Sequence, residues 1–454
     1  MKKYILILVI FYSQFVFSQN ADSVVIKKIV DETMTHSTAY ENLRKLCKQA
    51  GPRLSGSSAF AKAVSLVSAM MKVINPDTVY LQQCMVPHWV RGEEERGQII
   101  LSGGKKYDLN LCALGNSVGT GAKGITADIV EINSMQQLIQ LGSNGIKGKI
   151  VFFNFPMNPT YIRTFRAYGE SGVSRTRGPS LAGKYGAVGA MVRSLSSNLT
   201  DYPHTGTTTY NDSFPKIPAV AISTNDAEYL SSQLKRQKVK GFFRTTSKML
   251  PDAIGYNVVA EIRGSQIPEE IITVGGHLDS WDLAEGANDD GSGVVQSIEV
   301  LRTLIALGVK PKRTIRAVAF ANEENGLRGA QKYLEEAKSK SEKHLFAMES
   351  DAGGFTPRGF GLDMPATQMQ KILQWKNLFY SYGVYDFSAG GGGSDIAPLK
   401  AIGAALVGLI PDSQRYFDIH HAATDVFENV SERELNLGAA NMAALIWLVS
   451  EYGL

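Results

Sequence analysis

The amino-acid sequence predicts an α/β protein whose main domain is a mostly parallel, helix-covered sheet, with a β-rich segment inserted into it. Apolar runs with strand character recur in the second half of the chain, and helical patterns separate them. This alternation is typical of a parallel sheet with helices on its faces. The four runs occupy residues 271–274, 314–320, 345–348 and 404–410.

Each of these runs is followed by side chains that can bind a metal ion. The loops at the carboxyl ends of parallel strands converge on one crevice in an open α/β sheet. The sequence therefore predicts one site that collects these side chains. In the order of the runs they are His277, the pair Glu323 and Glu324, Asp351, and the pair His420 and His421.

Three segments with different texture divide the chain. Residues 19–115 and 247–454 are expected to form the main domain, and apolar positions from Val294 to Ile305 recur at helical spacing between the first two runs. Residues 116–246 instead contain short β-like runs and glycine turns, and none of these runs ends in a catalytic cluster. We expect 116–246 to form a separate inserted domain.

Residues 1–18 have the pattern of a secretory signal peptide. Lys2 and Lys3 precede an apolar run over residues 4–17, and Ser18 provides a small residue before the cut. The run is too short for a comfortable membrane span. We expect an exported protein, periplasmic or secreted, without stable membrane insertion.

Charge and cysteine content exclude several classes of protein. The formal net charge of +4 falls by two when the signal lysines are removed, which leaves too weak a field for nucleic acid. Cys47, Cys84 and Cys112 can form at most one disulfide, so the fold does not depend on a disulfide framework. No cysteine lies among the candidate ligands, which favours a site of imidazoles and carboxylates.

The glycine-rich stretch 275–293 carries the start of a two-metal site. Asp279 follows His277 by two residues, and Asp289 follows it by twelve. Ligating imidazoles need an acidic partner behind them, a role we assign to Asp279, and dinuclear sites need a carboxylate that bridges the ions. Asp290 competes with Asp289 for the bridging role, and the register favours Asp289.

The acidic residues after the second and third runs suit two different tasks. Glu323 and Glu324 could be no more than a charged helix start. In this context the chemistry needs both, because a ligand must stay ionised while a general base must be free to pass a proton. Glu349 is the rival of Asp351.

These residues make the chain similar to the secreted two-zinc exopeptidases, a family that includes bacterial aminopeptidases and glutamate carboxypeptidase, and most similar to its carboxypeptidase Q branch. The resemblance extends over nearly the whole chain after residue 18. Outside the metal motifs it rests on residues 51–57 (GPRLSGS), 87–89 (PHW), 91–94 (RGEE), 124–127 (GITA), 203–206 (PHTG) and 215–218 (PKIP). In this family the inserted segment is a protease-associated domain.

The resemblance assigns roles to individual residues. Asp289 would bridge two zinc ions, Glu324 would ligate one of them, and Glu323 would accept a proton from the attacking water. His421 lies four residues before Asp425, the interval of the family's last ligand. The metal ligands implied in this way are His277, Asp289, Glu324, Asp351 and His421.

Five ligands for two ions leave open coordination positions, which is the catalytic pattern. A purely nitrogen and oxygen set suits zinc first, with cobalt or manganese as substitutes. The resemblance also implies a cis peptide bond between Asp289 and Asp290, and a homodimer. His420 takes a position beside the substrate carbonyl that is often a tyrosine in the aminopeptidases, so the group that stabilises the oxyanion stays open.

The expected activity is hydrolysis of peptide bonds in short peptides or dipeptides. The glycine run 390–393 and the two residues after it, Ser394 and Asp395, are expected to border the substrate pocket. The inserted domain would roof the crevice and restrict it to short substrates. Two alternatives keep the fold: a non-catalytic receptor-like binding protein and a single-zinc glutaminyl cyclase. The intact five-ligand set argues against both.

Overall fold

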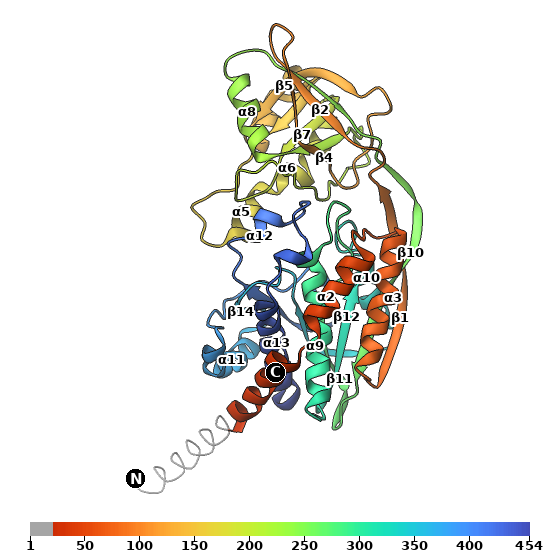
Figure 1. Cartoon of the computed structure of the whole chain (residues 1–454), viewed down its shortest axis with the longest axis vertical. Coiled ribbons are helices and arrows are strands. Elements are labelled where there is room, and N and C mark those ends of the chain that lie inside the picture. The colour runs from red at the N-terminus through yellow and green to blue at the C-terminus, as the bar shows by residue number, and fades with distance from the viewer. Residues whose placement is uncertain (1–20) are drawn as a thin grey trace.

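The computed structural model describes residues 21–454, which form two sheets toward opposite ends of an elongated molecule (Figure 1). The expected signal peptide, residues 1–18, lies outside the described residues. One sheet has seven strands and the other has eight. No helix of the described residues is long and apolar enough to cross a membrane.

The seven-stranded sheet of the main domain has the predicted parallel strands at its centre. Strands β12, β11, β13 and β15 pair in parallel and coincide with the four apolar runs. The outer strands β1, β10 and β14 pair antiparallel, so the sheet is mixed around a parallel centre. In spatial order the strands are β1 (Thr78–Val90), β10 (Lys248–Ile262), β12 (Arg313–Phe320), β11 (Ile267–His277), β13 (Lys343–Glu349), β15 (Ala405–Pro411) and β14 (Pro357–Asp363).

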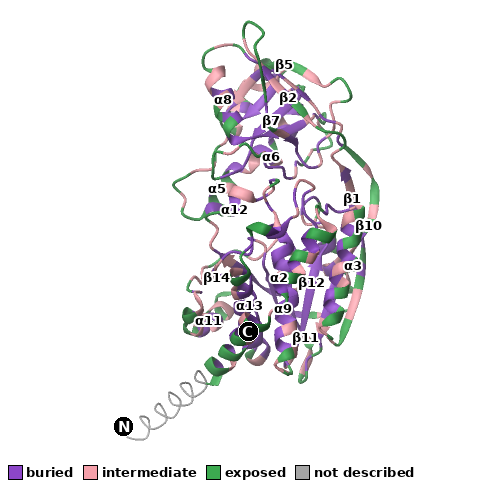
Figure 2. Cartoon of the chain, in the orientation of Figure 1, coloured by how far each residue is buried: buried purple, intermediate pink, exposed green. Residues whose placement is uncertain are grey.

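Helices cover both faces of this sheet, because successive strand residues point to opposite faces. Val258 packs in the large core with α3, α9 and α13, whereas the neighbouring Val259 packs with Tyr333 of α10 on the other face. Figure 2 shows the central strands as buried. The helices of the main domain are 21–36, α2 (Ala39–Lys45), α3 (Ser58–Val73), α9 (Ser292–Ala306), α10 (Arg328–Ser339), α11 (Ala366–Trp375), α12 (Tyr416–Ile419) and α13 (Glu432–Tyr452).

Local sequence explains where two of the longer helices begin. The Ser57 side chain accepts a hydrogen bond from the Phe60 amide at the start of α3, and Ser431 does the same for Glu434 in α13. The predicted helical pattern from Val294 to Ile305 lies in α9, whose apolar residues up to Leu304 are buried. The short helical turns are η1 (Leu46–Ala50), η2 (Ala287–Gly291), η3 (Lys376–Leu378), η4 (Tyr380–Tyr382), η5 (Ala397–Ile402) and η6 (Phe427–Asn429).

The eight-stranded sheet is inserted between β1 and β10 of the main sheet. Its strands β5, β6, β7 and β8 are parallel neighbours, and the others pair antiparallel. In spatial order they are β3 (Lys106–Asp108), β2 (Arg96–Ile100), β9 (Lys240–Arg244), β5 (Ile125–Ile132), β6 (Ile150–Phe153), β7 (Gly189–Arg193), β8 (Ala219–Ile222) and β4 (Leu111–Ala113). Its helices are α4 (Met135–Ile146), α5 (Thr164–Ser171), α6 (Val173–Thr176), α7 (Gly178–Lys184) and α8 (Thr224–Leu234).

This second sheet begins earlier than the predicted boundary at residue 116. Strand β2 starts at Arg96 and pairs with β9 near the other end of the insertion. Strand β3, which follows β2 in the sequence and forms the edge of the sheet, is exposed and charged. It has no apolar alternation that would mark it as part of a sheet. We refer to residues 96–244 as the inserted domain. The long antiparallel β1 and β10 ribbon connects it to the main domain (Figure 1).

The three cysteines are buried and unpaired in the described structure. Cys47 and Cys84 lie in the main domain, and Cys112 lies in β4 of the inserted domain. The fold is therefore held by the apolar cores of its two domains, without a disulfide among the described residues.

Candidate metal centre

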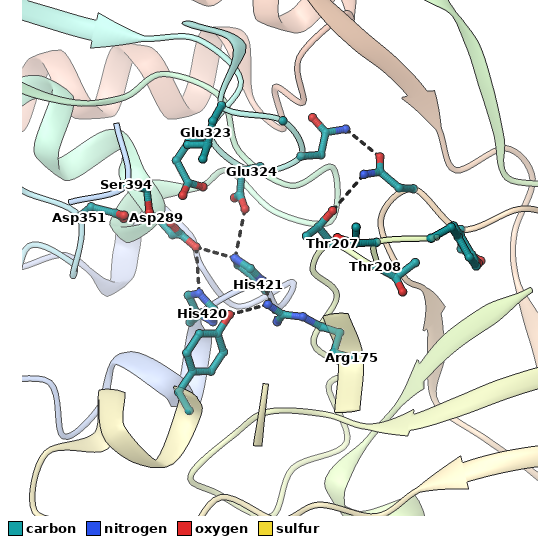
Figure 3. Close-up of a pocket in the computed structure, with 18 of the residues that line it drawn as sticks. Arg175, Thr207, Thr208, Asp289, Glu323, Glu324, Asp351, Ser394, His420 and His421 are labelled. Atoms are coloured by element: carbon teal, nitrogen blue, oxygen red, sulfur yellow. Dashed lines mark hydrogen bonds and ion pairs between the residues drawn. The ribbon is translucent and has the colours of Figure 1, made fainter. Parts of the chain in front are cut away.

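The predicted ligands meet at the carboxyl ends of the parallel strands of the main sheet. Figure 3 shows four of them: Asp289, Glu324, Asp351 and His421. His277 is the last residue of β11, and Glu324 and Asp351 follow the ends of β12 and β13. His421 follows α12, in the loop after β15. The parallel strands thus bring together groups that are far apart in the sequence.

Asp289 lies at the middle of this cluster and faces two imidazoles with its two oxygens. Oδ1 is 3.2 Å from Nε2 of His277, and Oδ2 is 3.1 Å from Nε2 of His421. A second carboxylate completes each side: Asp351 Oδ1 lies 3.5 Å from His277 Nε2, and Glu324 Oε2 lies 3.2 Å from His421 Nε2. The five side chains form two sets that share Asp289, which is the arrangement a bridging carboxylate requires.

The chemistry of this cluster fits divalent cations. Glu324 Oε1 is buried without a hydrogen-bond donor, and the buried Asp289 Oδ2 faces imidazole nitrogens, Nε2 of His421 at 3.1 Å and Nε2 of His420 at 3.4 Å. Buried carboxylate oxygens are costly unless they are hydrogen-bonded, paired or bound to a metal. A nitrogen and oxygen set with imidazoles suits zinc.

The electrostatics of the cluster point in the same direction. Although burial opposes it, Asp289 and Asp351 hold the pKa of His277 well above its usual value. Burial also tends to lower the pKa of His421. Glu324 and Asp289 nevertheless hold the pKa of His421 well above its usual value. Carboxylates that favour a proton on Nε2 also favour a divalent cation there, because the two compete for the same atom.

Asp290, the competitor of Asp289, is held by main-chain amides. Its Oδ2 accepts from the His277 amide at 3.0 Å, and its Oδ1 accepts from the Gly293 amide at 2.8 Å. Distance alone would group Asp290 with His277 and Asp351, since their ligand atoms lie within 4.8 Å of one another. The amide contacts occupy its oxygens, so the geometry favours Asp289.

Glu349, the rival of Asp351, is also saturated by the main chain. It accepts hydrogen bonds from the amides of Asp395 at 3.1 Å and Ile396 at 3.0 Å. Asp351 instead lies on the pocket wall. Gly393 must remain a glycine, because a Cβ there would lie 2.1 Å from Glu349 Oε2.

Asp279 joins His277 to Glu323 through two different groups. The Asp279 main-chain carbonyl lies 2.9 Å from His277 Nδ1, while its carboxylate is 3.9 Å from that atom. The carboxylate accepts from the Glu323 amide at 3.0 Å. The partner that orients His277 is thus the carbonyl of Asp279, because the carboxylate is turned toward the loop that carries Glu323.

Glu323 lies on the wall of the pocket between the two domains. Burial raises the pKa of Glu323 to about 8, and the negative charges of Asp351 and Glu324 act in the same direction. His277 opposes this shift. A carboxyl group with such a pKa exchanges protons near neutrality, as a general base must. A bound cation nearby would lower this pKa.

The loop that carries Asp289 is fixed from the side of α12. Asp425 accepts hydrogen bonds from the amides of Asn288 at 2.8 Å and Asp289 at 3.0 Å. The peptide bond between Asp289 and Asp290 is cis, as expected from the family resemblance. Asp425 therefore links the loop that carries Asp289 to the loop of His420 and His421.

The three residues expected at the substrate lie in different environments. His420 and Ser394 line the pocket, and the His420 ring stacks on His421 with 3.6 Å between ring centroids. Asp395 is only 1% exposed and does not line the pocket. Asp395 therefore lies behind the pocket wall, where burial and the nearby Glu349 raise its pKa well above the usual value.

Several site residues come from the inserted domain, and the sequence assigned none of them a role. Tyr168 and Arg175 line the pocket, and His204 and Thr205 contact the loop of the two histidines. The available signal was the PHTG segment at residues 203–206, which supported the family resemblance without indicating chemistry. Arg175 had no sequence signal.

The parallel sheet with imidazoles and carboxylates gathered at its strand ends is the architecture of a metal-dependent hydrolase. The chain belongs to peptidase family M28, whose family model matches residues 257–446. Carboxypeptidase Q of Mus musculus is 34% identical over 417 residues, which cover 91% of this chain and 86% of that protein. The predicted resemblance is therefore confirmed, and the chain is a metallopeptidase by family.

Solved structures agree with this assignment. A peptidase M28 precursor from Shewanella amazonensis has a TM-score of 0.90 at 31% identity, covering 95% of this chain and 97% of that one. A zinc aminopeptidase from Bacillus subtilis shares the fold with a TM-score of 0.62 at 23% identity, covering 90% and 93%. These similarities confirm the predicted fold class.

Proposed function

We propose that the protein is a dinuclear zinc exopeptidase that hydrolyses short peptides or dipeptides. The observation that carries the proposal is the position of Asp289, whose two oxygens face separate imidazole and carboxylate pairs. His277 and Asp351 would hold one ion, and His421 and Glu324 would hold the other. Zinc ions at such a site activate a water molecule and polarise the scissile carbonyl.

Glu323 is the proposed general base. It lies on the pocket wall, its carboxylate belongs to neither ligand pair, and its amide is held by Asp279. From there Glu323 would accept the proton of the attacking water and deliver it to the amine of the leaving product. The raised pKa supports this role, because the group must both take up and release a proton.

The pocket supports a preference for short substrates. It has a volume of about 840 Å³ and walls from both domains, including Tyr168 and Thr208 of the inserted domain and Asn325 of the main domain. A crevice closed by a second domain restricts chain length and limits the access of water. A folded protein would not fit, which favours exopeptidase over endopeptidase activity.

Arg175 favours recognition of a free carboxyl terminus. It is 6% exposed and lines the pocket, its hydrogen bonds go to the neutral Thr205 carbonyl and Tyr168 hydroxyl, and its Nη1 lies 3.4 Å from His421 Nδ1. No acidic side chain among residues 21–454 forms an ion pair with it. A buried guanidinium without a carboxylate partner would gain a charge-assisted hydrogen bond from the carboxylate of a bound peptide.

A capped-peptide panel tests this function. A cleaved dipeptide would be compared with its amino-blocked, carboxyl-blocked and doubly blocked forms, on enzyme stripped by chelation and reloaded with zinc. Activity should require zinc, and blocking both termini should abolish turnover. Equal hydrolysis of the doubly blocked form, or internal cuts in a folded protein, would contradict the exopeptidase proposal. A metal count of two per chain separates it from a single-zinc glutaminyl cyclase, and turnover itself separates it from a receptor-like protein.

Export and assembly are part of the same proposal. The pattern of residues 1–18 supports a periplasmic or secreted location, and short peptides are the proposed partners. Fractionation of cells that express the full chain tests the location. Sedimentation tests the proposed homodimer.

A further inference from the structure

A two-residue segment of the inserted domain lies directly against the two histidines of the metal centre. The Thr205 amide donates a hydrogen bond to the His421 carbonyl at 2.9 Å. The His204 Nδ1 atom lies 2.7 Å from the His420 carbonyl. In the opposite direction, His421 Nδ1 lies 3.3 Å from the Thr205 carbonyl. Three contacts therefore join His204 and Thr205 to a loop of the other domain.

The chemistry of these atoms fixes the direction of each bond. A carbonyl oxygen only accepts, so His204 must carry its proton on Nδ1 and donate to His420. The Nε2 atom of His421 faces Asp289 and Glu324, so a cation on Nε2 leaves the proton on Nδ1, which then donates to the Thr205 carbonyl. Nη1 of Arg175 lies 3.4 Å from this Nδ1 and donates to the same carbonyl at 3.2 Å, because a protonated Nδ1 cannot accept from it. Such a bond from the second ring nitrogen is what orients a ligating imidazole.

His421 needs this support because of its backbone conformation. Its φ is +62°, in the left-handed region, which is unfavourable for a residue with a Cβ. Contacts on both the main chain and the ring hold His421 in this conformation. Thr205 bonds to the His421 carbonyl and lies against Nδ1 of its ring, and the His420 ring stacks on the His421 ring. A conformation of this kind persists when its surroundings determine it.

His204 and Thr205 are in turn anchored in the sheet of the inserted domain. The His204 amide donates to Ser194 Oγ at 2.8 Å, and Ser194 Oγ donates to the Ile222 carbonyl at the end of β8 at 2.7 Å. The Thr205 hydroxyl donates to the Ala113 carbonyl at the end of β4 at 3.0 Å. His204 is 1% exposed. The support of His421 is thus part of a rigid framework.

We infer that the inserted domain is a structural part of the metal centre, in which Thr205 contacts His421 directly and His204 is a positioning residue that holds the adjacent His420 carbonyl. The ion held by His421 and Glu324 depends on this contact, and the ion held by His277 and Asp351 does not. This inference rests on the proposed dinuclear centre. It gives the inserted domain a role in metal binding in addition to closing the pocket.

Substitutions of His204 that differ in where they place a donor test the inference. In His204→Asn the amide nitrogen replaces Nδ1 at the same distance along the side chain, so the bond to His420 is kept. In His204→Gln the amide nitrogen reaches the position of Nε2, which has no hydrogen-bond partner. The readout is the rate at which each of the two ions is released to a colour-forming chelator, together with zinc content.

The Asn variant should release both ions at the wild-type rates. The Gln variant should release one ion faster than the wild type and the other at the wild-type rate. Loss of a partner that bonds a ligand directly costs about 10–100-fold in metal affinity, and this is the upper limit for His204, which acts through the His420 carbonyl. His344→Gln is the matched control, because this buried histidine lies at the opposite end of β13 and bonds to Thr273 and Glu342. It should keep both wild-type release rates.

The outcomes distinguish the inference from the proposed function. Wild-type release of both ions by a folded Gln variant would overturn the inference alone. A wild-type protein that binds a single ion would contradict the dinuclear centre itself. If the Gln variant does not fold, His204→Ala replaces it, because it removes the donor without a longer side chain. His204→Ala should release one ion faster than the Asn variant does, and equal release rates in the two variants would overturn the inference.

Discussion

The two sides of the pocket contribute to the metal centre in different ways. The main domain supplies side chains: His277 ends a parallel strand, and Glu324 and Asp351 lie in the loops that follow two others. The inserted domain supplies chiefly main-chain contacts, of which the Thr205 amide and carbonyl are the nearest. Side chains determine which ion binds, whereas the main chain determines how rigidly a ligand is held. A domain can thus be part of a metal site without contributing a ligand.

The largest expected effect concerns the general base on the main-domain side. Glu323→Gln removes the proton acceptor and leaves all five ligands, so turnover should fall about 10²–10⁴-fold. Zinc content should stay at two per chain. Steady-state kinetics with metal analysis measures both, and Glu335→Gln on the exposed face of α10 is the control. Near-normal turnover would remove Glu323 from the mechanism.

The next effect concerns the cation on the inserted-domain side. Arg175→Met should lower kcat/KM for a dipeptide with a free carboxylate by about 10–100-fold, since a hydrogen bond to a charged group contributes about 1.5–3 kcal/mol. The preference for the free form over the carboxyl-amide form should disappear with it. Lys216→Met is the control, because this pocket cation is exposed and pairs with Asp212. An unchanged preference would exclude Arg175 from carboxylate recognition.

The smallest effect is a pH dependence of stability that originates in the inserted domain. Burial lowers the pKa of His204 from 6.5 to about 4. Between these values the unfolded chain binds a proton that the folded chain does not, so stability falls as the pH falls through this window.

The His204→Asn variant lacks this titration. Relative to the variant, the metal-free wild type should lose up to about 1.4 kcal/mol of unfolding free energy per pH unit between pH 6.5 and 4. Denaturant unfolding of both proteins at several pH values measures the difference. If the difference in unfolding free energy between the two proteins stays constant over this range, folding does not lower the pKa of His204.

The same contrast explains what the sequence could predict. The strands and the candidate metal-binding residues could be predicted because their signals are local: an apolar run, a turn, and a side chain suited to metal binding. The choice of five ligands among these candidates came from the family resemblance. Choosing Asp289 over Asp290 needed more, since adjacent aspartates look alike until the amides of His277 and Gly293 are seen to occupy one of them. A candidate ligand was thus encoded locally, and its rival was excluded by tertiary contacts.

The contribution of the inserted domain could not be predicted in this way. Thr205 acts through its amide and carbonyl, which every residue type but proline possesses, so its side chain gives no signal. The early start of that domain at Arg96 was hidden because β2 pairs with β9, which is more than a hundred residues away. Asp395 was expected at the pocket from its place after a glycine run, but its orientation depends on Glu349 of β13.

The most direct test of the dinuclear centre is anomalous diffraction at the zinc edge from crystals of the zinc-loaded protein. Two peaks per chain are expected, one beside His277 and Asp351 and the other beside His421 and Glu324, with an oxygen of Asp289 in contact with each. A single peak, or two peaks that do not share Asp289, would contradict the two-zinc centre.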